Sequence, residues 1–177
     1  EGATAILLHP DLEQVLLVWE RGAWTTSGGA VDGGEGKLAA LNREVWEELD
    51  VKLDLEWGAH YVGGYQQSRA RDGVMNDNFS AFVVKLASPH FKPDNKEIME
   101  AHFFPWRAIL QKWRDAGSIS TEKKVPLDVG KGDARALVHI NVLFWLDMYE
   151  KGMALKCRNK EEKEMPKEGE LGYAQLG

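Results

Sequence analysis

The chain has 177 residues, of which 44% are hydrophobic and 28% are charged, and its formal net charge is −6. This composition is typical of a folded globular protein and excludes a disordered or collagen-like chain. The negative charge argues against a general electrostatic attraction to nucleic acid, so RNA stays open as a partner without being indicated. The single cysteine, Cys157, excludes an intrachain disulfide and a zinc site built from two or four cysteines.

The sequence gives no sign of a membrane segment or of a secretion signal. No run reaches the roughly 18 apolar residues that a membrane-spanning helix requires, so we expect no membrane association. The first residues do not show a basic segment followed by an apolar one. We therefore expect an intracellular location, either the cytoplasm or an organelle that removes a presequence.

Short apolar runs alternate with amphipathic segments along the chain. Strands are predicted at residues 3–8, 14–19, 51–55, 59–65, 79–86 and 97–104. Six glycines between Gly22 and Gly36 predict a loop, and residues 66–78, 88–95 and 117–131 are also expected to be irregular. Helices are predicted at residues 37–49, 108–115 and 134–149. Strands interrupted by helices predict an α/β fold with a mixed sheet between helices.

The apolar side chains of the predicted helices repeat at helical spacing. In the first helix the expected buried face consists of Leu38, Leu41, Val45 and Leu49. In the last helix it consists of Leu137, Ile140, Leu143, Phe144 and Leu146. The tryptophans expected in the core are Trp106, Trp113 and Trp145.

The first predicted helix carries three carboxylates that share one sector of its surface. Glu44, Glu47 and Glu48 fall within about 100° of one another, beside the apolar face. Like charges at this spacing destabilise a helix, and a hard divalent cation such as Mg²⁺ would remove the repulsion. Arg43 lies four residues before Glu47 and can orient or neutralise it. A solvated acidic face is the simpler alternative for these residues taken alone.

The preceding loop favours a cation site over a solvated acidic face, because it adds glycines and a further carboxylate in a recognisable pattern. Gly29, Glu35 and the segment 43–51 match eight of the nine specified positions of the Nudix box, Gly-x5-Glu-x7-Arg-Glu-apolar-x-Glu-Glu-x-Gly-apolar. The chain therefore resembles the Nudix hydrolase family. Asp50 stands where the family has glycine. Because Asp tolerates the left-handed conformation that ends many helices, and no metal ligand is lost, we do not interpret Asp50 as the mark of an inactive enzyme.

Two flanking segments extend the resemblance. Trp24 and the segment 27–29 are similar to the family's Trp-x-x-Pro-Gly-Gly, with Ser27 in place of proline. Residues 97–105 resemble the later family segment Glu-Ile-x-Glu-x-x-Trp-Phe-Pro. The resemblance implies a Nudix fold, which is an α/β/α sandwich with a mixed β-sheet. It also implies a metal-dependent pyrophosphohydrolase that uses Mg²⁺ or Mn²⁺ to cleave a nucleoside diphosphate linked to another group.

The resemblance also implies roles for individual residues. The metal ligands would be Gly29 through its carbonyl, with Glu35, Glu44, Glu47 and Glu48. Glu35 could instead tie down the loop. The catalytic residues would be Arg43, Glu44, Glu47 and Glu97. Glu97 could act as a general base or a further ligand, or simply end a surface strand.

Other residues have more than one interpretation. Arg69 and Arg71 could bind substrate phosphates, but an ordinary solvated hairpin loop is favoured for them. A base-stacking role for Trp24 is left unassigned, and His102 and His139 are expected to be structural.

We expect a Nudix domain over residues 1–152 and a charged tail over residues 153–177. Residues 156–170 are rich in charge, whereas apolar side chains return at Leu171, Tyr173 and Leu176. This pattern suits a tether that docks on a protein partner, and an extension without a role is the equal alternative. Because the helix ending near Tyr149 should close the fold that the resemblance implies, residues from about Lys156 onward should be dispensable for hydrolysis. The alternative function is a Nudix-fold subunit of a large assembly with a scaffold or RNA-binding role.

Overall fold

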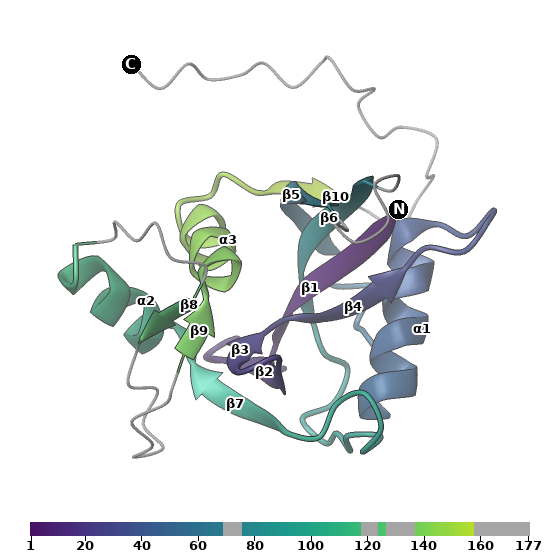
Figure 1. Cartoon of the computed structure of the whole chain (residues 1–177), viewed down its shortest axis with the longest axis horizontal. Helices are drawn as coiled ribbons and strands as arrows, with labels where there is room; N and C mark the ends of the chain where they lie inside the picture. The colour runs from purple at the N-terminus through teal and green to yellow at the C-terminus, as the bar shows by residue number, and fades with distance from the viewer. Residues whose placement is uncertain (69–75, 118–123, 127–136, 158–177) are drawn as a thin grey trace.

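The computed structural model describes residues 1–68, 76–117, 124–126 and 137–157 (Figure 1). Its helices are α1 (Lys37–Leu49), α2 (Trp106–Asp115) and α3 (Ile140–Glu150). Its longer strands are β1 (Gly2–Leu8), β2 (Gln14–Glu20), β5 (Ala59–Ser68), β6 (Asn76–Lys85) and β7 (Ala101–Pro105). Its shorter strands are β3 (Ala23–Thr25), β4 (Ser27–Ala30), β8 (Lys124–Pro126), β9 (Leu137–His139) and β10 (Leu155–Cys157).

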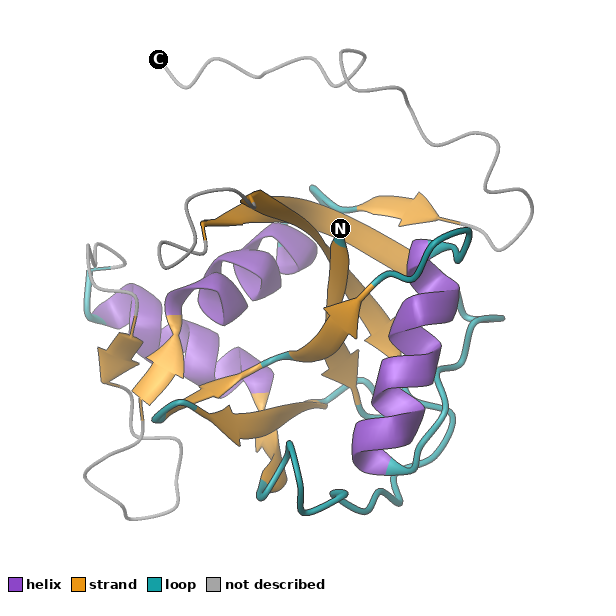
Figure 2. Ribbon diagram, turned by 45° about the vertical axis from the view of Figure 1, so that its right-hand side comes forward, coloured by secondary structure: helices purple, strands orange, loops and turns teal. Residues whose placement is uncertain are grey.

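The helices cover the sheet from two sides, α1 on one side and α2 with α3 on the other (Figures 1 and 2). All seven residues of β1 are buried, and alternate side chains of a strand point to opposite faces. Ala3, Ala5 and Leu7 belong to the core on the α1 side, while Ile6 and Leu8 belong to the core on the α2 and α3 side. The predicted α/β/α sandwich is therefore confirmed.

The sheet is mixed, as predicted, and β1 lies at its centre. The strand β1 pairs in parallel with β6 along its full length, and antiparallel with β4 at its start and β2 at its end. The order of strands is β10-β5-β6-β1-β2-β3-β9-β8, with β4 added to β1 and β7 added to β2. Because β4 pairs with β1, the glycine-rich segment becomes part of the sheet beside α1.

The prediction of a loop through residues 22–36 was wrong over its first half. Residues 23–25 form β3 against β2, and residues 27–30 form β4 against β1. Gly28 explains why glycine is compatible with this strand: a Cβ at this position would lie 2.2 Å from the carbonyl oxygen of Ala3. The glycine therefore permits a close approach of two backbones rather than a flexible turn.

Other predicted boundaries differ because pairing and capping are decided by distant residues. Residues 51–55 do not form a strand and contribute only a single bridge, from Leu53 to Leu86. The strand predicted at 97–104 begins at Ala101. The last helix begins at Ile140, because His139 has an extended backbone and its side chain accepts a hydrogen bond from the amide of Asn141.

The predicted cores of the helices are largely confirmed. In α1, Leu41, Val45 and Leu49 are buried, and Leu38 is partly buried against the same core. The tryptophans Trp106, Trp113 and Trp145 are all buried. In α3, however, Phe144 is 49% exposed, so its place in the predicted buried face was wrong. No helix in the described part of the chain is long and apolar enough to cross a membrane.

The segment that we expected to be a tail contributes a strand to the sheet. Leu155, Lys156 and Cys157 form β10, which pairs antiparallel with β5. Residues 158–177, and with them the proposed docking patch, lie outside the described residues. The boundary between the domain and the tail can therefore be tested by ending the chain either before or after β10.

Two truncated proteins separate the strand from the residues after it. A chain ending at Cys157 retains the pairing of β10 with β5, whereas a chain ending at Gly152 loses it. We expect the shorter protein to be less stable by about 1–2 kcal/mol, because three cross-strand pairs are removed. Urea unfolding of both proteins measures the difference. Equal stabilities would show that β10 does not contribute to the domain.

Candidate functional site

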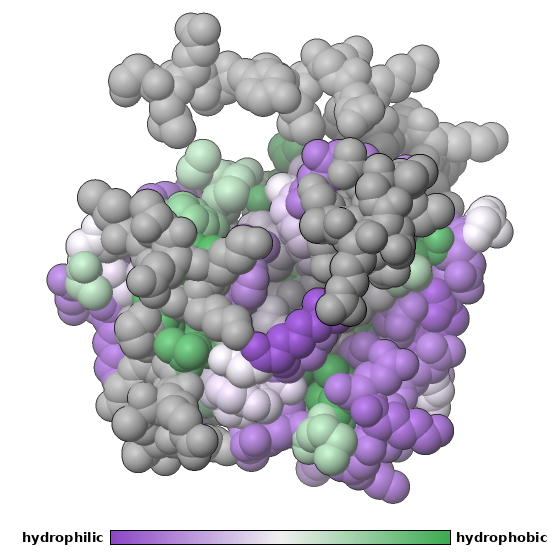
Figure 3. All heavy atoms as spheres, in the orientation of Figure 1, coloured by the Kyte–Doolittle hydropathy of each residue, from purple (hydrophilic) through white to green (hydrophobic). Residues whose placement is uncertain are grey.

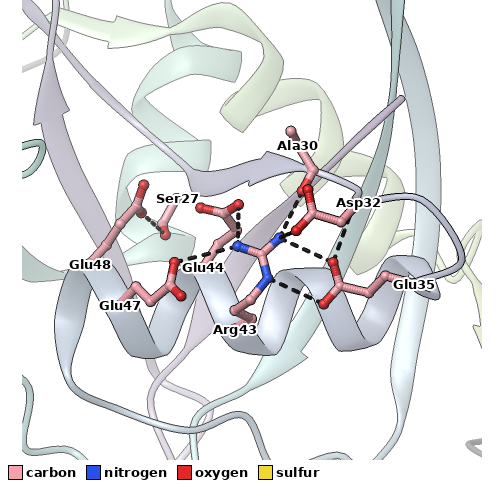
Figure 4. A network of polar contacts seen from close by, with 8 residues as sticks. All are labelled: Ser27, Ala30, Asp32, Glu35, Arg43, Glu44, Glu47 and Glu48. Carbon is pink, nitrogen blue, oxygen red and sulfur yellow. Dashed lines mark hydrogen bonds and ion pairs between the residues drawn. The ribbon is translucent and has the colours of Figure 1, made fainter.

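The carboxylates of α1 face the strand β4 and the loop that joins β4 to α1 (Figure 4). The outer surface over α1 is largely hydrophilic (Figure 3). At the centre of the carboxylate cluster, the guanidinium group of Arg43 lies among Glu35, Glu44 and Glu47 (Figure 4). Sequence-based reasoning expected these residues to be close together, and the structure brings them to one place.

Arg43 is the hub of this network. Its Nε and Nη2 donate to the two carboxylate oxygens of Glu35 at 3.2 and 3.1 Å, a bidentate contact. Its Nη1 donates to Glu44 at 2.8 Å and to Glu47 at 3.4 Å, and Nη2 also donates to the carbonyl of Ala30 at 3.1 Å. The hydrogen bond from Arg43 lowers the pKa of Glu35 and raises that of the guanidinium group. These contacts match the loop-anchoring interpretation of Glu35.

Gly29 provides the space that the Glu44 carboxylate occupies. A Cβ built on Gly29 would lie 2.4 Å from the carboxyl carbon of Glu44 and 2.6 Å from both of its oxygens. The carboxylate therefore packs directly on the backbone of β4, where a larger residue would displace it. The predicted grouping of Gly29 with Glu44 is thus present in the geometry.

Glu48 is the buried member of the set. Its carboxylate points away from Arg43 and accepts a 2.6 Å hydrogen bond from the hydroxyl of Ser27 (Figure 4). Burial raises the pKa of Glu48 to about 7, the hydrogen bond from Ser27 opposes this, and the charges of Glu44, Glu97 and Glu20 add to it. A carboxyl group with such a pKa is a candidate for a functional site.

Glu97 lies in a loop that is fastened to the end of α1. The amide of Lys92 donates to the carbonyl of Leu49 at 2.7 Å, and the amide of Asp94 donates to the carbonyl of Glu48 at 2.9 Å. The Asp94 side chain in turn accepts hydrogen bonds from the amides of residues 96–98. This arrangement places the charge of Glu97 close enough to raise the pKa of Glu48.

Three residues of the site were not predicted as functional. Ser27 was noted only as a substitute for proline, Glu20 ends β2, and Asp32 lies 3.7 Å from Arg43. Glu20 and Asp32 stand outside the specified positions of the box. The charges of Glu20 and Asp32 reach the site only because β2 and the loop approach α1. No local sequence pattern distinguishes these two residues from other acidic residues of the chain.

Other candidate residues lie elsewhere. Arg69 and Arg71 fall outside the described residues. Trp24 is buried, with its ring packed against Trp19 and Phe104. His102 contacts Glu100 at 2.8 Å, in keeping with the structural role expected for this histidine.

The donor set suits a hard divalent cation, because it consists of the carboxylate oxygens of Glu44, Glu47 and Glu48. Within the described residues, no three His, Cys, Asp or Glu side chains are arranged so that they could already hold a metal ion. Instead, Arg43 forms ion pairs with Glu35, Glu44 and Glu47. The residues fit Mg²⁺ or Mn²⁺ by the chemistry of their oxygen atoms, while the contacts that these carboxylates make within the described residues are with Arg43 and Ser27.

The chain matches the model of one protein family. A family model, the NUDIX domain, matches residues 1–122. The MutT NUDIX hydrolase from Burkholderia pseudomallei is 23% identical, with a TM-score of 0.46, over 60% of this chain and 82% of that protein. The E. coli dihydroneopterin triphosphate pyrophosphohydrolase is 18% identical, with a TM-score of 0.46, over 62% of this chain and 83% of that protein. A search of curated proteins finds no match.

A single methyl group at Gly29 should test the contact with Glu44. In Gly29→Ala the obstructed group is the end of a flexible side chain, so the carboxylate should move while the fold persists. We expect the Kd for Mn²⁺ to rise roughly tenfold, as measured by isothermal titration. Gly33→Ala is the matched control, because a Cβ there meets nothing within 4 Å. Equal affinities of the two variants for Mn²⁺ would contradict a role of the contact between Gly29 and Glu44 in cation binding.

The raised pKa of Glu48 predicts how stability depends on pH when a chelator is present. Between about 4.5 and 7, the folded protein keeps the proton that the unfolded chain releases, so rising pH should remove stability. Glu48→Gln should lack this loss and be more stable than the wild-type protein at pH 8. Urea unfolding at pH 5, 6, 7 and 8 measures both. A difference between the two proteins that does not change with pH would contradict the assignment.

Proposed function

This chain belongs to the Nudix family of hydrolases, which act on phosphoric anhydride bonds, and we propose that it is a metal-dependent pyrophosphohydrolase. We propose that its substrate is a nucleoside diphosphate linked to another group. The observation that supports this best is the seating of the Glu44 carboxylate on Gly29 beside the buried carboxylate of Glu48. A purely structural helix has no need of carboxylates crowded in this way.

The proposed roles follow from where each side chain lies. Glu44 and Glu48 are the less exposed carboxylates and would bind the cation together with Glu47 and the carbonyl of Gly29. Arg43 orients Glu44 and Glu47 and holds the loop through Glu35. Glu97 is exposed and close to Glu48, so it is the proposed acceptor of the proton from the attacking water. When bound, Mg²⁺ or Mn²⁺ would polarise the bridging phosphate and lower the pKa of a bound water.

The substrate must approach from the side where the carboxylates are open. Glu47 keeps 58% of its side chain exposed, and Glu97 lies in an exposed turn. An anionic phosphate group would be repelled by these carboxylates without a cation, which is the physical reason to couple substrate binding to the metal. Arg69 and Arg71 stay predictions for phosphate binding.

A hydrolysis screen tests the proposal. Sugar nucleotides, dinucleoside polyphosphates, oxidised nucleotides, capped RNA and inositol pyrophosphates are each incubated with Mg²⁺, Mn²⁺ or a chelator, and release of phosphate products is measured. We expect metal-dependent cleavage of at least one nucleotide class. Cleavage that is equally fast in the chelator would contradict metal dependence, and absence of turnover throughout would favour the scaffold function.

Single substitutions test whether the hydrolytic activity depends on the carboxylates of α1. Glu47→Gln and Glu48→Gln should each lower kcat by orders of magnitude without unfolding the protein, since each removes a proposed ligand and relieves repulsion. Glu56→Gln is the control, because Glu56 is exposed and lies outside α1. Unchanged kcat in both α1 variants would rule out these assignments.

A further inference from the structure

Ser27 is buried at the first position of β4, and its hydroxyl is directed at the carboxylate of Glu48 (Figure 4). The donor and acceptor oxygens are 2.6 Å apart, within the range of a strong hydrogen bond from a hydroxyl to a carboxylate. Ser27 is 2% exposed and Glu48 is 8% exposed, so water cannot readily replace this donor. The contact therefore restrains a side chain that otherwise has several rotatable bonds.

The serine is itself held on its backbone side. Ser27 is the register partner of Ala5 in the pairing of β4 with β1. The hydroxyl of Thr4 donates to the carbonyl of Ser27 at 3.1 Å and lies 2.6 Å from the hydroxyl of Thr26. Because the Thr4 hydroxyl has only one hydrogen, Thr26 is the donor in that second contact. A chain of three hydroxyl-bearing residues thus fixes Ser27 relative to β1.

We propose that Ser27 is a positioning residue that holds the Glu48 carboxylate in the orientation needed for cation binding. This inference rests on the proposed function. Ser27 binds only Oε2 of Glu48, and among the described residues Oε1 accepts no hydrogen bond. One oxygen is therefore anchored to the sheet while the other stays available to a cation. Partners that orient a metal-binding carboxylate in this way change affinity without touching the metal.

The first test measures cation binding by the free protein, with no substrate present. In Ser27→Ala the fold keeps its packing but Glu48 loses its donor, so we expect the Kd for Mn²⁺ to rise about tenfold. Ser80→Ala is the matched control: Ser80 is also buried on a strand, but its hydroxyl accepts from Lys37 at 3.0 Å instead of contacting a carboxylate. Equal Kd values for Ser27→Ala and the wild-type protein would overturn the inference.

The second test separates positioning from a general effect on the fold. If Ser27 acts through Glu48, Ser27→Ala should have no further effect on Mn²⁺ affinity in the Glu48→Gln background. High Mn²⁺ concentrations should also restore most of the kcat that Ser27→Ala loses at low Mn²⁺. Additive effects on affinity, or a loss of kcat that persists at saturating Mn²⁺, would overturn the inference.

Failure of the inference can be told apart from failure of the proposed function. A wild-type protein that binds Mn²⁺ and hydrolyses a substrate, together with a Ser27→Ala variant that behaves identically, overturns the positioning role alone. A wild-type protein that neither binds Mn²⁺ nor hydrolyses any substrate of the screen overturns both.

Discussion

The close approach of β4 to both β1 and α1 is the constraint on which the site depends. Gly28 lies against the backbone of β1, Gly29 lies under the carboxylate of Glu44, and Ser27 reaches Glu48. Three consecutive residues therefore connect the centre of the sheet to two acidic side chains of one helix. A side chain at Gly28 would push the strands apart, whereas one at Gly29 would only displace Glu44, so the two glycines serve different purposes.

The site accommodates its negative charge in two ways. Glu35, Glu44 and Glu47 share the guanidinium group of Arg43, which offsets one of their three negative charges and lies close to each of them. Within the described residues Glu48 has no ion pair with a basic side chain, and burial raises its pKa to about 7 even though the hydrogen bond from Ser27 lowers it. The cost of ionising a buried carboxyl group is thus concentrated at a single residue. A bound cation would lower this cost, so the proposed metal binding would be coupled to the ionisation of Glu48.

The box and the helix that carries it were predictable because their information is local. The apolar spacing of Leu41, Val45 and Leu49 fixes one face of α1, and the carboxylates must then lie beside it. Glycine has a local preference for turns, so β4 was assigned to a loop. Only the pairing with β1, whose partner residues lie 22–28 positions earlier in the sequence, makes it a strand. The contact of Ser27 with Glu48 joins residues that are 21 positions apart, and no local sequence pattern in either segment predicts it.

Asp50, which replaces the family glycine, ends α1 at a point where a later loop can bind the end of the helix. Asp50 adopts a left-handed conformation with φ of 52°, and its amide donates to Trp46 at 2.9 Å, so α1 ends where the family pattern ends it. Because the helix stops there, the carbonyls of Glu48 and Leu49 are open to the amides of Asp94 and Lys92. Those hydrogen bonds bring the loop with Glu97 to the acidic site. The aspartate thus preserves a helix end, and through it the approach of a residue from a distant segment.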